Sequence, residues 1–489
     1  MNKMGINMRV FLINPPTQSG VIFMKEIGRC GRRSIAGEIW PQTGLAYLAA
    51  VLRGAGHEVG LDDAMAEGRS FDECVKRIGM FRPDLLVLHT VTPTHNSDVV
   101  FCARVKDTYP GMPVAFVGTH AAALGETVLR SSVADLAVAD EGEIPLAQLA
   151  DAFDRAGGVE KVDIAALAGE MPGFWVKHKD GNISFGGPGP LVEDLDSLPL
   201  PARDLLPNHR YRMPFFTGEP FATVIPSRGC PWRCSFCRSG LTWGDKVRTR
   251  SVPNVLDELE DLKDRRGTRN IVFMTDTFTY RKDWVLDLCA GMRDRKLDLR
   301  WICNSRVDTI DAERLAAMAG AGCRMVAYGV ESADPKILQE TGKGITPEQS
   351  VKAINLTQKA AIPAFAYFIV GLPGETWETI RKTIDFAIQL DPDHAFFHIA
   401  TPFPGTELYD LAQEKGWLVT KDWDLYEEDG GGVMRTEFLS PDDLRKAQKM
   451  AIRRFYLRPS RLIREIRSVR GLRDLWIRLS AGMALLRSR

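Results

Sequence analysis

Three cysteines within eight residues constrain this 489-residue chain more than any other feature. Cys230, Cys234 and Cys237 stand at spacings of four and three, so the chain around them must form a tight loop that brings three thiolates to one ligand. A 4Fe-4S cluster usually takes four cysteines. No fourth Cys or His lies nearby, since His209 is 21 residues upstream and Cys289 is 52 residues downstream. The spacing therefore indicates a 4Fe-4S cluster with one iron left open to a small molecule.

A structural zinc site, a disulfide pair and buried packing cysteines are the alternatives for this loop. Zinc prefers four closed ligands, commonly in paired spacings, and no second pair exists here. Disulfides are typical of secreted chains, whereas nine cysteines without a recognisable signal peptide indicate a reducing cytosol. The apolar and charged fractions, 45% and 26%, are those of a soluble globular protein. We therefore expect a cytoplasmic protein, with zinc as the remaining alternative to the cluster.

Residues 1–156 alternate predicted strands with predicted helices, as at 44–54 and 71–81. The strands are expected at Arg9–Asn14, Glu58–Asp62, Leu85–His89, Val114–Val117 and Leu136–Ala139. Such alternation predicts an α/β domain with a doubly wound, Rossmann-like parallel sheet and ligands at the carboxyl ends of its strands. A nucleotide-binding domain needs a Gly-x-Gly-x-x-Gly turn after the first strand, and Asn14-Pro15-Pro16-Thr17 does not resemble one. A structural or receiver-like domain stays open on fold alone.

Residues 157–219 read as a linker with a small hairpin, 173–177 and 183–185, around the turn dipeptide Asp180-Gly181. Residues 220–401 then contain six further strand and helix units. Their strands are expected at Ala222–Pro226, Asn270–Thr275, Leu299–Asn304, Arg324–Gly329, Ala364–Val370 and Ala395–Ala400. Six such units predict an open, partial (β/α)6 barrel with its active site at the carboxyl ends of the strands, and the cysteine loop follows the first strand.

Residues 402–489 form a helical C-terminal region with a strongly basic end. From Ala451 to Arg489 there are eleven Arg and no Lys against Glu465 and Asp474, a local charge of +9. Basic amphipathic helices commonly lie on membrane surfaces, and packing on the protein's own acidic body is the equal alternative. No nucleic-acid-reading module is recognisable. Residues 426–432 suit either a lid over the barrel or a plain turn.

The cysteine loop, with Phe236 before its last cysteine, resembles the signature of the radical S-adenosylmethionine (SAM) superfamily. From Asn14-Pro15-Pro16 to Pro459 the chain resembles the cobalamin-dependent branch, which includes radical C-methylases and the anaerobic magnesium-protoporphyrin monomethyl ester cyclase. This resemblance implies a 4Fe-4S cluster on Cys230, Cys234 and Cys237, together with SAM and cobalamin.

The resemblance also implies which strand ends contact SAM. The residues concerned are Asp276 near its amino group, Asn304 and Arg306 at its carboxylate, Glu331 and Ser332 at its ribose, and Gly371 and Phe236 at its adenine. Structural roles stay open for several of these: Gly371 can simply end a strand, Glu331 can pair with an arginine, and Phe236 can pack in a core.

Two loops are similar to the Gly-Gly-x-His and Gly-Glu-Gly-Glu loops of the family's cobalamin domain. They are Val117-Gly118-Thr119-His120, with one Gly where the family has two, and Asp140-Glu141-Gly142-Glu143, with Asp140 for Gly. We expect cobalamin contacts from Asn14, Asp62, Thr90, Thr92, Gly118, His120, Glu141 and Gly142. The Asp-x-His-x-x-Gly motif that supplies a histidine to cobalt in many cobalamin proteins is absent, so the lower cobalt face is expected to lack a histidine ligand.

The function implied is a radical C-methyltransferase that removes hydrogen from an unactivated carbon with a 5′-deoxyadenosyl radical and transfers methyl from methylcobalamin. The alternative is an anaerobic oxidative cyclase, or another rearrangement of a tetrapyrrole or lipid, without net methylation. A cobalamin- or redox-sensing regulator with an inert barrel is the reading outside enzymes. The expected partners are a hydrophobic small-molecule substrate and an electron donor such as flavodoxin or ferredoxin, with no nucleic acid.

Overall fold

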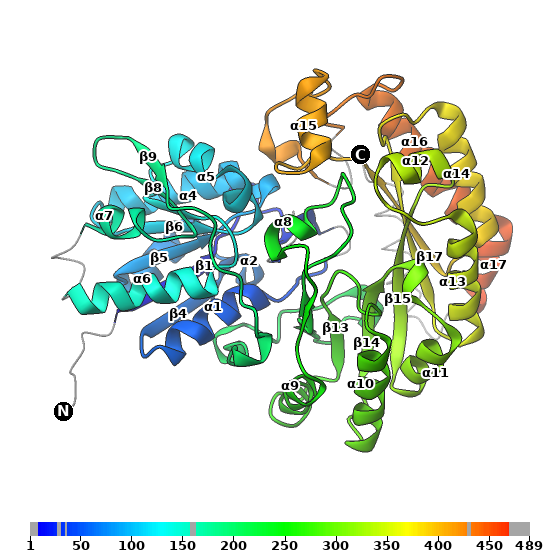
Figure 1. The fold of residues 1–489 in the computed structure, drawn as a ribbon, viewed down its shortest axis with the longest axis horizontal. Helices are drawn as coiled ribbons and strands as arrows, with labels where there is room; N and C mark the ends of the chain where they lie inside the picture. The colour runs from blue at the N-terminus through cyan, green and yellow to red at the C-terminus, as the bar shows by residue number, and fades with distance from the viewer. Residues whose placement is uncertain (1–7, 27–30, 35–36, 157–162, 428–431, 469–489) are drawn as a thin grey trace. The chain divides into compact units, whose positions relative to one another are not determined.

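The structure is a computed structural model that describes residues 8–26, 31–34, 37–156, 163–427 and 432–468. The chain divides into two compact units (Figure 1). The first unit holds most residues up to Tyr211, and the second holds most residues from Arg212 onward. Only the short segments 35–38 and 241–244 belong to the unit on the other side of this division.

The first unit is built on a seven-stranded sheet of order β4-β1-β5-β6-β7-β8-β9. Its strands are β1 (Arg9–Asn14), β4 (Glu58–Asp63), β5 (Leu85–His89), β6 (Val114–Val117), β7 (Leu136–Val138), β8 (Phe174–Lys177) and β9 (Ile183–Phe185). The first five are parallel. Because β4 lies on one side of β1 and β5 on the other, the strand order reverses between β1 and β5, which is where doubly wound sheets bind ligands.

Helices that follow the parallel strands in the sequence cover this sheet (Figure 1). They are α1 (Thr43–Gly54), α2 (Ala64–Glu67), α3 (Phe71–Phe81), α4 (His95–Thr108), α5 (Thr119–Ser131) and α6 (Glu143–Ala156). Helix α3 shows why they form where they do. Ser70 accepts from the Glu73 backbone and Glu73 closes the capping box, while Cys74, Val75 and Ile78 are buried against Phe11 and Leu86 of the sheet and the rest of this core. The doubly wound fold predicted from the sequence is confirmed.

The hairpin expected in a linker is part of this sheet. After α7 (Ile164–Gly169), β8 pairs antiparallel with β7, and β9 pairs with β8. Phe174 and Val176 are fully buried, and the Trp175 ring stacks on Phe185 at 4.4 Å. Farther along, Tyr211 donates to Asp63 Oδ2 at 2.9 Å. The unit therefore extends well beyond residue 156, because the hairpin covers the free edge of β7.

The second unit contains six parallel strands that follow one another in chain order. They are β10 (Ala222–Val224), β13 (Asn270–Phe273), β14 (Arg300–Ser305), β15 (Cys323–Glu331), β16 (Ala364–Val370) and β17 (His394–Ile399). The helices α9 (Val252–Asp264), α10 (Lys282–Asp294), α11 (Ala312–Gly320), α13 (Pro347–Lys359), α14 (Trp377–Leu390) and α16 (Pro441–Tyr456) pack along one side of this sheet (Figure 1). Since β10 and β17 are both edge strands, this is the open partial barrel that the sequence predicted.

Alternate residues of the barrel strands face opposite sides, as the pleat of a strand requires. In β16 and β17, Phe368, Val370, Phe397 and Ile399 pack into the core shared with the outer helices. The intervening side chains point to the inner face of the barrel. Cys303 of β14 is 2% exposed and belongs to the outer core, so this thiol has a packing role.

The C-terminal region continues with α15 (Glu407–Glu414), α16 and α17 (Pro459–Ser468). Arg454 pairs with Asp385 and Arg458 with Asp391, so the first basic residues of this region contact acidic residues of the protein itself. Among the described residues, no helix combines the length and apolarity that crossing a bilayer requires. Most of the basic end, residues 469–489, and much of the 426–432 segment lie outside the described residues.

Candidate active site

The cysteine loop is held at the carboxyl end of the first barrel strand. Directly after β10, the short strand β11 (Ser227–Arg228) pairs antiparallel with β12 (Arg248–Thr249), and the loop lies between them. Gly229 starts the loop with a φ of 90°, a conformation that favours glycine. This two-stranded ribbon fixes both ends of the loop and so limits where its three thiols can lie.

The inside of the loop is anchored to later parts of the second unit. Ser235 N donates to Thr341 O at 3.0 Å, and its own carbonyl accepts from Leu408 N at 2.9 Å. Arg238 Nη1 donates to Pro404 O at 2.5 Å. The ring of Phe236 packs against the small core that contains Ile337, Leu372, Ala400, Leu408, Ala412 and Met434. Phe236 therefore has a packing role here, and its contact with adenine stays a prediction.

The three loop cysteines carry free thiols and lie close enough to interact electrostatically. Cys230 and Cys234 are partly exposed and Cys237 is exposed, yet desolvation by the surrounding protein atoms raises the pKa of Cys230 to about 11 and that of Cys237 to about 12. The backbone N–H of Ser239 donates to Cys237 Sγ at 3.5 Å. Thiolates are soft ligands that suit iron–sulfur clusters, and the charge of a bound metal offsets the cost of ionising these thiols. The donor set therefore fits a 4Fe-4S cluster.

A buried ion pair lies at the end of β15, next to this loop. Lys343 Nζ is 2.7 Å from Glu331 Oε1, and both side chains are less than a tenth exposed. The β15 and β16 register shifts between Gly329 and Glu331, and Glu331 has a φ of 64°. A β-carbon on Gly329 would lie 2.3 Å from Glu331 Oε1 and 2.6 Å from Lys343 Nζ, so glycine leaves room for the pair. Strained non-glycine backbone of this kind is concentrated at functional sites.

Arg306 is fixed beside the same pair. Its guanidinium donates twice to the Asp308 carboxylate, at 3.0 and 2.9 Å, and once to Lys343 O at 2.8 Å. It also lies 4.0 Å from the centre of the Trp232 ring. Arg306 and Lys343 favour the thiolate form of Cys234, although burial keeps the pKa of this thiol raised. Sequence reasoning missed Lys343 and gave Trp232 no role. Nothing in their local pattern marks them, since their contacts come from segments distant in the sequence.

The other residues expected at SAM have mixed surroundings. The charge of Asp276 raises the pKa of Cys230 and Cys237, so this carboxylate faces the cysteine loop. Asn304 is partly exposed near the end of β14. Ser332, by contrast, is fully buried, and its Oγ is 3.3 Å from Thr383 Oγ1. It also accepts from the Asp334 backbone, just before α12 (Pro335–Glu340). Gly371 ends β16 and donates to Glu375 Oε2 at 2.6 Å.

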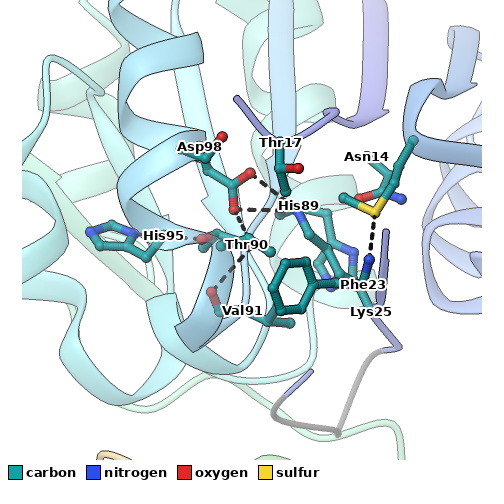
Figure 2. A network of polar contacts seen from close by, with 12 residues as sticks. Asn14, Thr17, Phe23, Lys25, His89, Thr90, Val91, His95 and Asp98 are labelled. Atoms are coloured by element: carbon teal, nitrogen blue, oxygen red, sulfur yellow. Dashed lines mark hydrogen bonds and ion pairs between the residues drawn. The ribbon is translucent and has the colours of Figure 1, made fainter. Parts of the chain in front are cut away.

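The crevice between β1 and β5 in the first unit holds a network of buried polar groups (Figure 2). Lys25 Nζ lies 3.1 Å from Asp98 Oδ1 and 3.4 Å from His89 O. Thr94 donates to Asp98 Oδ2 at 2.7 Å. Gln42 Nε2 donates to Lys25 O at 2.6 Å, so its carbonyl oxygen accepts from His89 Nδ1 at 2.8 Å. This arrangement leaves the His89 Nε2 lone pair as an acceptor.

Several cobalamin candidates from the sequence line the same crevice. His120 Nδ1 is 3.2 Å from Thr92 Oγ1, and the His120 ring packs on that of His95 at 4.2 Å between centroids. Thr90 Oγ1 is 3.5 Å from His95 Nδ1. Gly118 has a φ of 111°, and a β-carbon there would lie 2.3 Å from Thr90 O. Loop histidines most often lie at the protein surface, whereas His120 is fully buried.

The crevice also presents buried polar side-chain atoms with no hydrogen-bond partner, namely Asn14 Oδ1, His89 Nε2 and His95 Nε2. Burial lowers the pKa of His89 to about 3 and of His95 to about 4, so both rings are neutral at pH 7. Unsatisfied buried polar atoms are costly, and the amide-bearing periphery of a corrin can satisfy acceptors of this kind. The residues present therefore fit cobalamin.

The remaining cobalamin candidates are engaged elsewhere in the first unit. Asp62 pairs with Arg69 and Arg77 at 3.2 and 2.8 Å. Glu141 accepts from Val192 N at 2.9 Å. A β-carbon on Gly142 would lie 3.2 Å from the Leu48 side chain, so this glycine allows close packing. These contacts give the three residues structural roles, and their part in binding cobalamin stays a prediction.

Comparisons with known proteins match a domain family in each of the two units. Residues 32–150 match the family model of the B12 binding domain, and residues 224–387 match that of the radical SAM superfamily. The chain is 35% identical to an uncharacterized methyltransferase of Pyrococcus horikoshii, over 95% of this chain and 98% of the relative. It is 29% identical to the anaerobic magnesium-protoporphyrin IX monomethyl ester cyclase of Rubrivivax gelatinosus, over 83% of this chain and 70% of the relative.

Solved structures share the fold at low sequence identity. The radical SAM methyltransferase TsrM from Kitasatospora setae, with cobalamin and a 4Fe-4S cluster bound, has a TM-score of 0.69 at 18% identity, covering 93% of this chain and 90% of TsrM. The cobalamin-dependent radical enzyme OxsB has a TM-score of 0.73 at 16% identity, covering 98% of this chain and 72% of OxsB. The chain therefore belongs to the radical SAM superfamily, in the branch that carries an N-terminal B12-binding domain.

Proposed function

We propose that this protein is a cobalamin-dependent radical SAM C-methyltransferase acting on a small molecule. One observation carries the proposal: the same chain contains two cofactor sites. A three-cysteine loop lies at the end of the first strand of a partial barrel, and a Rossmann-like unit has a polar crevice that fits cobalamin. The relative from Pyrococcus horikoshii, which matches almost end to end, is named a methyltransferase.

The chain's own residues divide the work as follows. Cys230, Cys234 and Cys237 would hold the cluster and leave one iron for SAM. Arg306, which donates to Asp308 and to Lys343 O, is proposed to bind the SAM carboxylate, and Glu331, which pairs with Lys343, is proposed to bind the ribose. When bound, the cofactors supply the carbon-centred radical and the methyl group, while the protein orients them and excludes water.

An anaerobic cyclase is the second candidate, because a relative that covers most of the chain carries that name. The two reactions differ in the fate of SAM. A cobalamin methyltransferase consumes a second SAM to remethylate cobalt and releases S-adenosylhomocysteine, whereas a cyclase has no use for that step. The ratio of S-adenosylhomocysteine to 5′-deoxyadenosine therefore separates them.

The test is anaerobic and needs no substrate. The reconstituted protein is loaded with cobalamin, reduced and mixed with SAM, and both nucleosides are quantified by mass spectrometry. Stoichiometric S-adenosylhomocysteine together with methylcobalamin is expected. Bound cobalamin with 5′-deoxyadenosine but no S-adenosylhomocysteine would overturn the methyltransferase and favour the cyclase. Cys234→Ala is the control, which should form no 5′-deoxyadenosine. If the Cys234→Ala variant kept full biological activity, the result would favour the non-enzymatic alternative, a cobalamin- or redox-sensing regulator with an inert barrel.

Two partners belong to the same proposal. Reductive cleavage of SAM needs one electron from outside, so a flavodoxin- or ferredoxin-like donor is expected.

The tail is proposed to touch an anionic membrane surface, because Leu462 and Ile463 of α17 are 45% and 50% exposed beside basic residues. Flotation with phosphatidylglycerol vesicles tests this contact, with Leu462→Ser/Ile463→Ser as the variant expected to lose it. Equal flotation of variant and parent would contradict it.

A further inference from the structure

The last two barrel strands carry a row of aromatic rings on their inner face. We call it the aromatic face; it consists of Phe365 and Tyr367 of β16 and His394, Phe396 and His398 of β17. Phe365 and Phe396 have centroids 6.0 Å apart and planes 18° apart. Tyr367 and His398 follow at 5.5 Å and 27°, and Phe396 and His398 at 5.3 Å and 29°. Phe365 is tilted by 45° from Tyr367 and by 31° from His394, so the rings form one contiguous row in which three neighbouring pairs are stacked.

These rings are not part of the core between sheet and helices. That core takes the alternate residues of the same strands, including Ala366, Phe368 and Phe397. On the neighbouring strands, Ala327 of β15 and Asn304 of β14 are in register with Phe365, and Gly329 of β15 is in register with Tyr367. At this level of the inner face the aromatic rings therefore belong to β16 and β17, and the adjoining strands carry small or polar residues.

The strand register puts the rings at the level of the residues expected to bind SAM. Asn304 pairs with Ala327, and Ala327 pairs with Phe365. One rung higher, Gly329 pairs with Tyr367, which in turn pairs with Phe396. Paired residues on adjacent strands lie about 5 Å apart. Tyr367 and Phe396 are thus one and two strands away from the end of β15, where the Glu331 and Lys343 pair stands.

The aromatic face also keeps part of its surface exposed. Phe365 is 4% exposed, but the other four side chains of the aromatic face are partly exposed. Phe215, which contacts Phe365 and His394 at 5.9 and 5.4 Å, is 42% exposed. Offset stacking between aromatic planes stabilises contacts beyond the apolar area that they bury. A row of partly exposed rings, three neighbouring pairs of which are stacked, therefore favours a flat π system over a saturated chain or ring of equal size.

We propose that the aromatic face binds a planar, conjugated ring of the substrate, stacked on Tyr367 and Phe396, and so holds the carbon to be modified beside SAM. This inference rests on the proposed function. It narrows the substrate class to small molecules that carry such a ring, and it assigns specificity to two residues that no cofactor motif contains.

The test uses a matched pair of probes with the cobalamin-loaded, cluster-reconstituted protein. 2-(Hydroxymethyl)anthracene is flat and conjugated, and its fully hydrogenated counterpart has the same carbon skeleton without π electrons. Direct fluorescence titration gives the Kd of the first, and competition gives that of the second. The conjugated probe is expected to bind several-fold more tightly. Tyr367→Leu and Phe396→Leu should each raise its Kd by about 2- to 10-fold and leave the saturated probe nearly unaffected.

Two controls separate stacking from folding. Tyr367→Phe keeps the ring and should bind like the parent, and Phe438→Leu removes a 54% exposed aromatic outside the aromatic face. Equal affinity for both probes, or an unchanged Kd in the two leucine variants, would overturn the proposal. Formation of S-adenosylhomocysteine without substrate is measured on the same samples. It depends only on the cofactors, so its loss in the parent would count against the proposed function and not against the aromatic face.

Discussion

At the scale of single residues, the least expected feature is a fully buried ion pair. Lys25 and Asp98 have no exposed side-chain surface, and Thr94 donates a further hydrogen bond to the carboxylate. Burial lowers the pKa of Lys25 and raises that of Asp98, against their mutual attraction. Removing one member of such a pair leaves an uncompensated buried charge, which costs about 3–5 kcal/mol.

Lys25→Met should therefore destabilise the first unit by about 3–5 kcal/mol. The urea midpoint of the protein without cobalamin measures the effect. Lys25→Met/Asp98→Leu should recover most of the loss, because it removes both charges. Arg104→Met breaks an exposed pair with Asp72, and its effect should stay below about 1 kcal/mol. A single Lys25→Met variant as stable as the parent would show that Asp98 does not need its partner.

Residue-level prediction from the sequence is strongest where chemistry is local. Three cysteines within one loop stay near one another wherever the rest of the chain goes, and their charges influence one another's pKa. Among the described residues no group of three metal-ligating side chains is arranged to hold a metal ion, so the role of these cysteines as cluster ligands stays a prediction. The pair of Glu331 and Lys343 joins residues twelve apart, and that of Lys25 and Asp98 residues 73 apart. Neither spacing carries a signal, since only the folded sheet decides that these charges meet. Ser332 was given a ligand role by its motif, yet its hydroxyl contacts Thr383.

At the scale of elements, the turn after β16 depends on one buried carboxyl group. Glu375 Oε2 accepts from the backbone N–H groups of Gly371 and Leu372, at 2.6 and 3.1 Å. Burial raises the pKa of Glu375 to about 8, from a usual value of 4.5. The folded protein thus holds this proton more tightly than the unfolded chain. This tighter binding of the proton contributes to the free energy of unfolding. The contribution is fully present below pH 4.5 and is lost as the pH rises toward 8.

Glu375→Gln should remove this pH dependence, because an amide oxygen still accepts both hydrogen bonds and has no proton to lose. Between pH 5 and pH 8.5, the parent should lose about 2–4 kcal/mol relative to the variant. Urea midpoints at the two pH values give the comparison. Glu378→Gln, an exposed carboxyl on α14, serves as the control and should follow the parent. A constant difference between parent and Glu375→Gln would mean that Glu375 stays ionised throughout.

Most elements were predictable because each strand is a short apolar run closed by turn residues. The first three strands of the doubly wound sheet begin where the pattern put them, and β16 matches at both ends. The β8 and β9 hairpin was also found, but its place in the sheet was not. The hairpin sequence predicts that its two strands pair with each other. It does not predict that the hairpin also pairs with β7, because that depends on the free edge that β7 presents in the folded sheet.

At the scale of the whole molecule, each cofactor has its candidate residues in a separate unit. The cobalamin candidates Asn14 to Gly142 belong to the first unit, and the three cysteines and the SAM candidates belong to the second. Each unit has its own core. The two cofactor-binding activities should therefore be lost independently, although the methyl transfer needs both.

Two variants test this independence. Cys230→Ala should abolish the iron–sulfur absorbance after reconstitution and leave the affinity for cobalamin within about 2-fold, since no cobalamin candidate lies in its unit.

Gly118→Ala places a β-carbon 2.3 Å from Thr90 O at a φ of 111°, so it should weaken cobalamin binding by about 10-fold or more. It should also keep the cluster and SAM cleavage to 5′-deoxyadenosine, and lose methylcobalamin and S-adenosylhomocysteine together. If the Gly118→Ala protein binds cobalamin with normal affinity, the cofactor does not lie in this crevice. If the Cys230→Ala protein cannot bind cobalamin, the two units do not bind their cofactors independently.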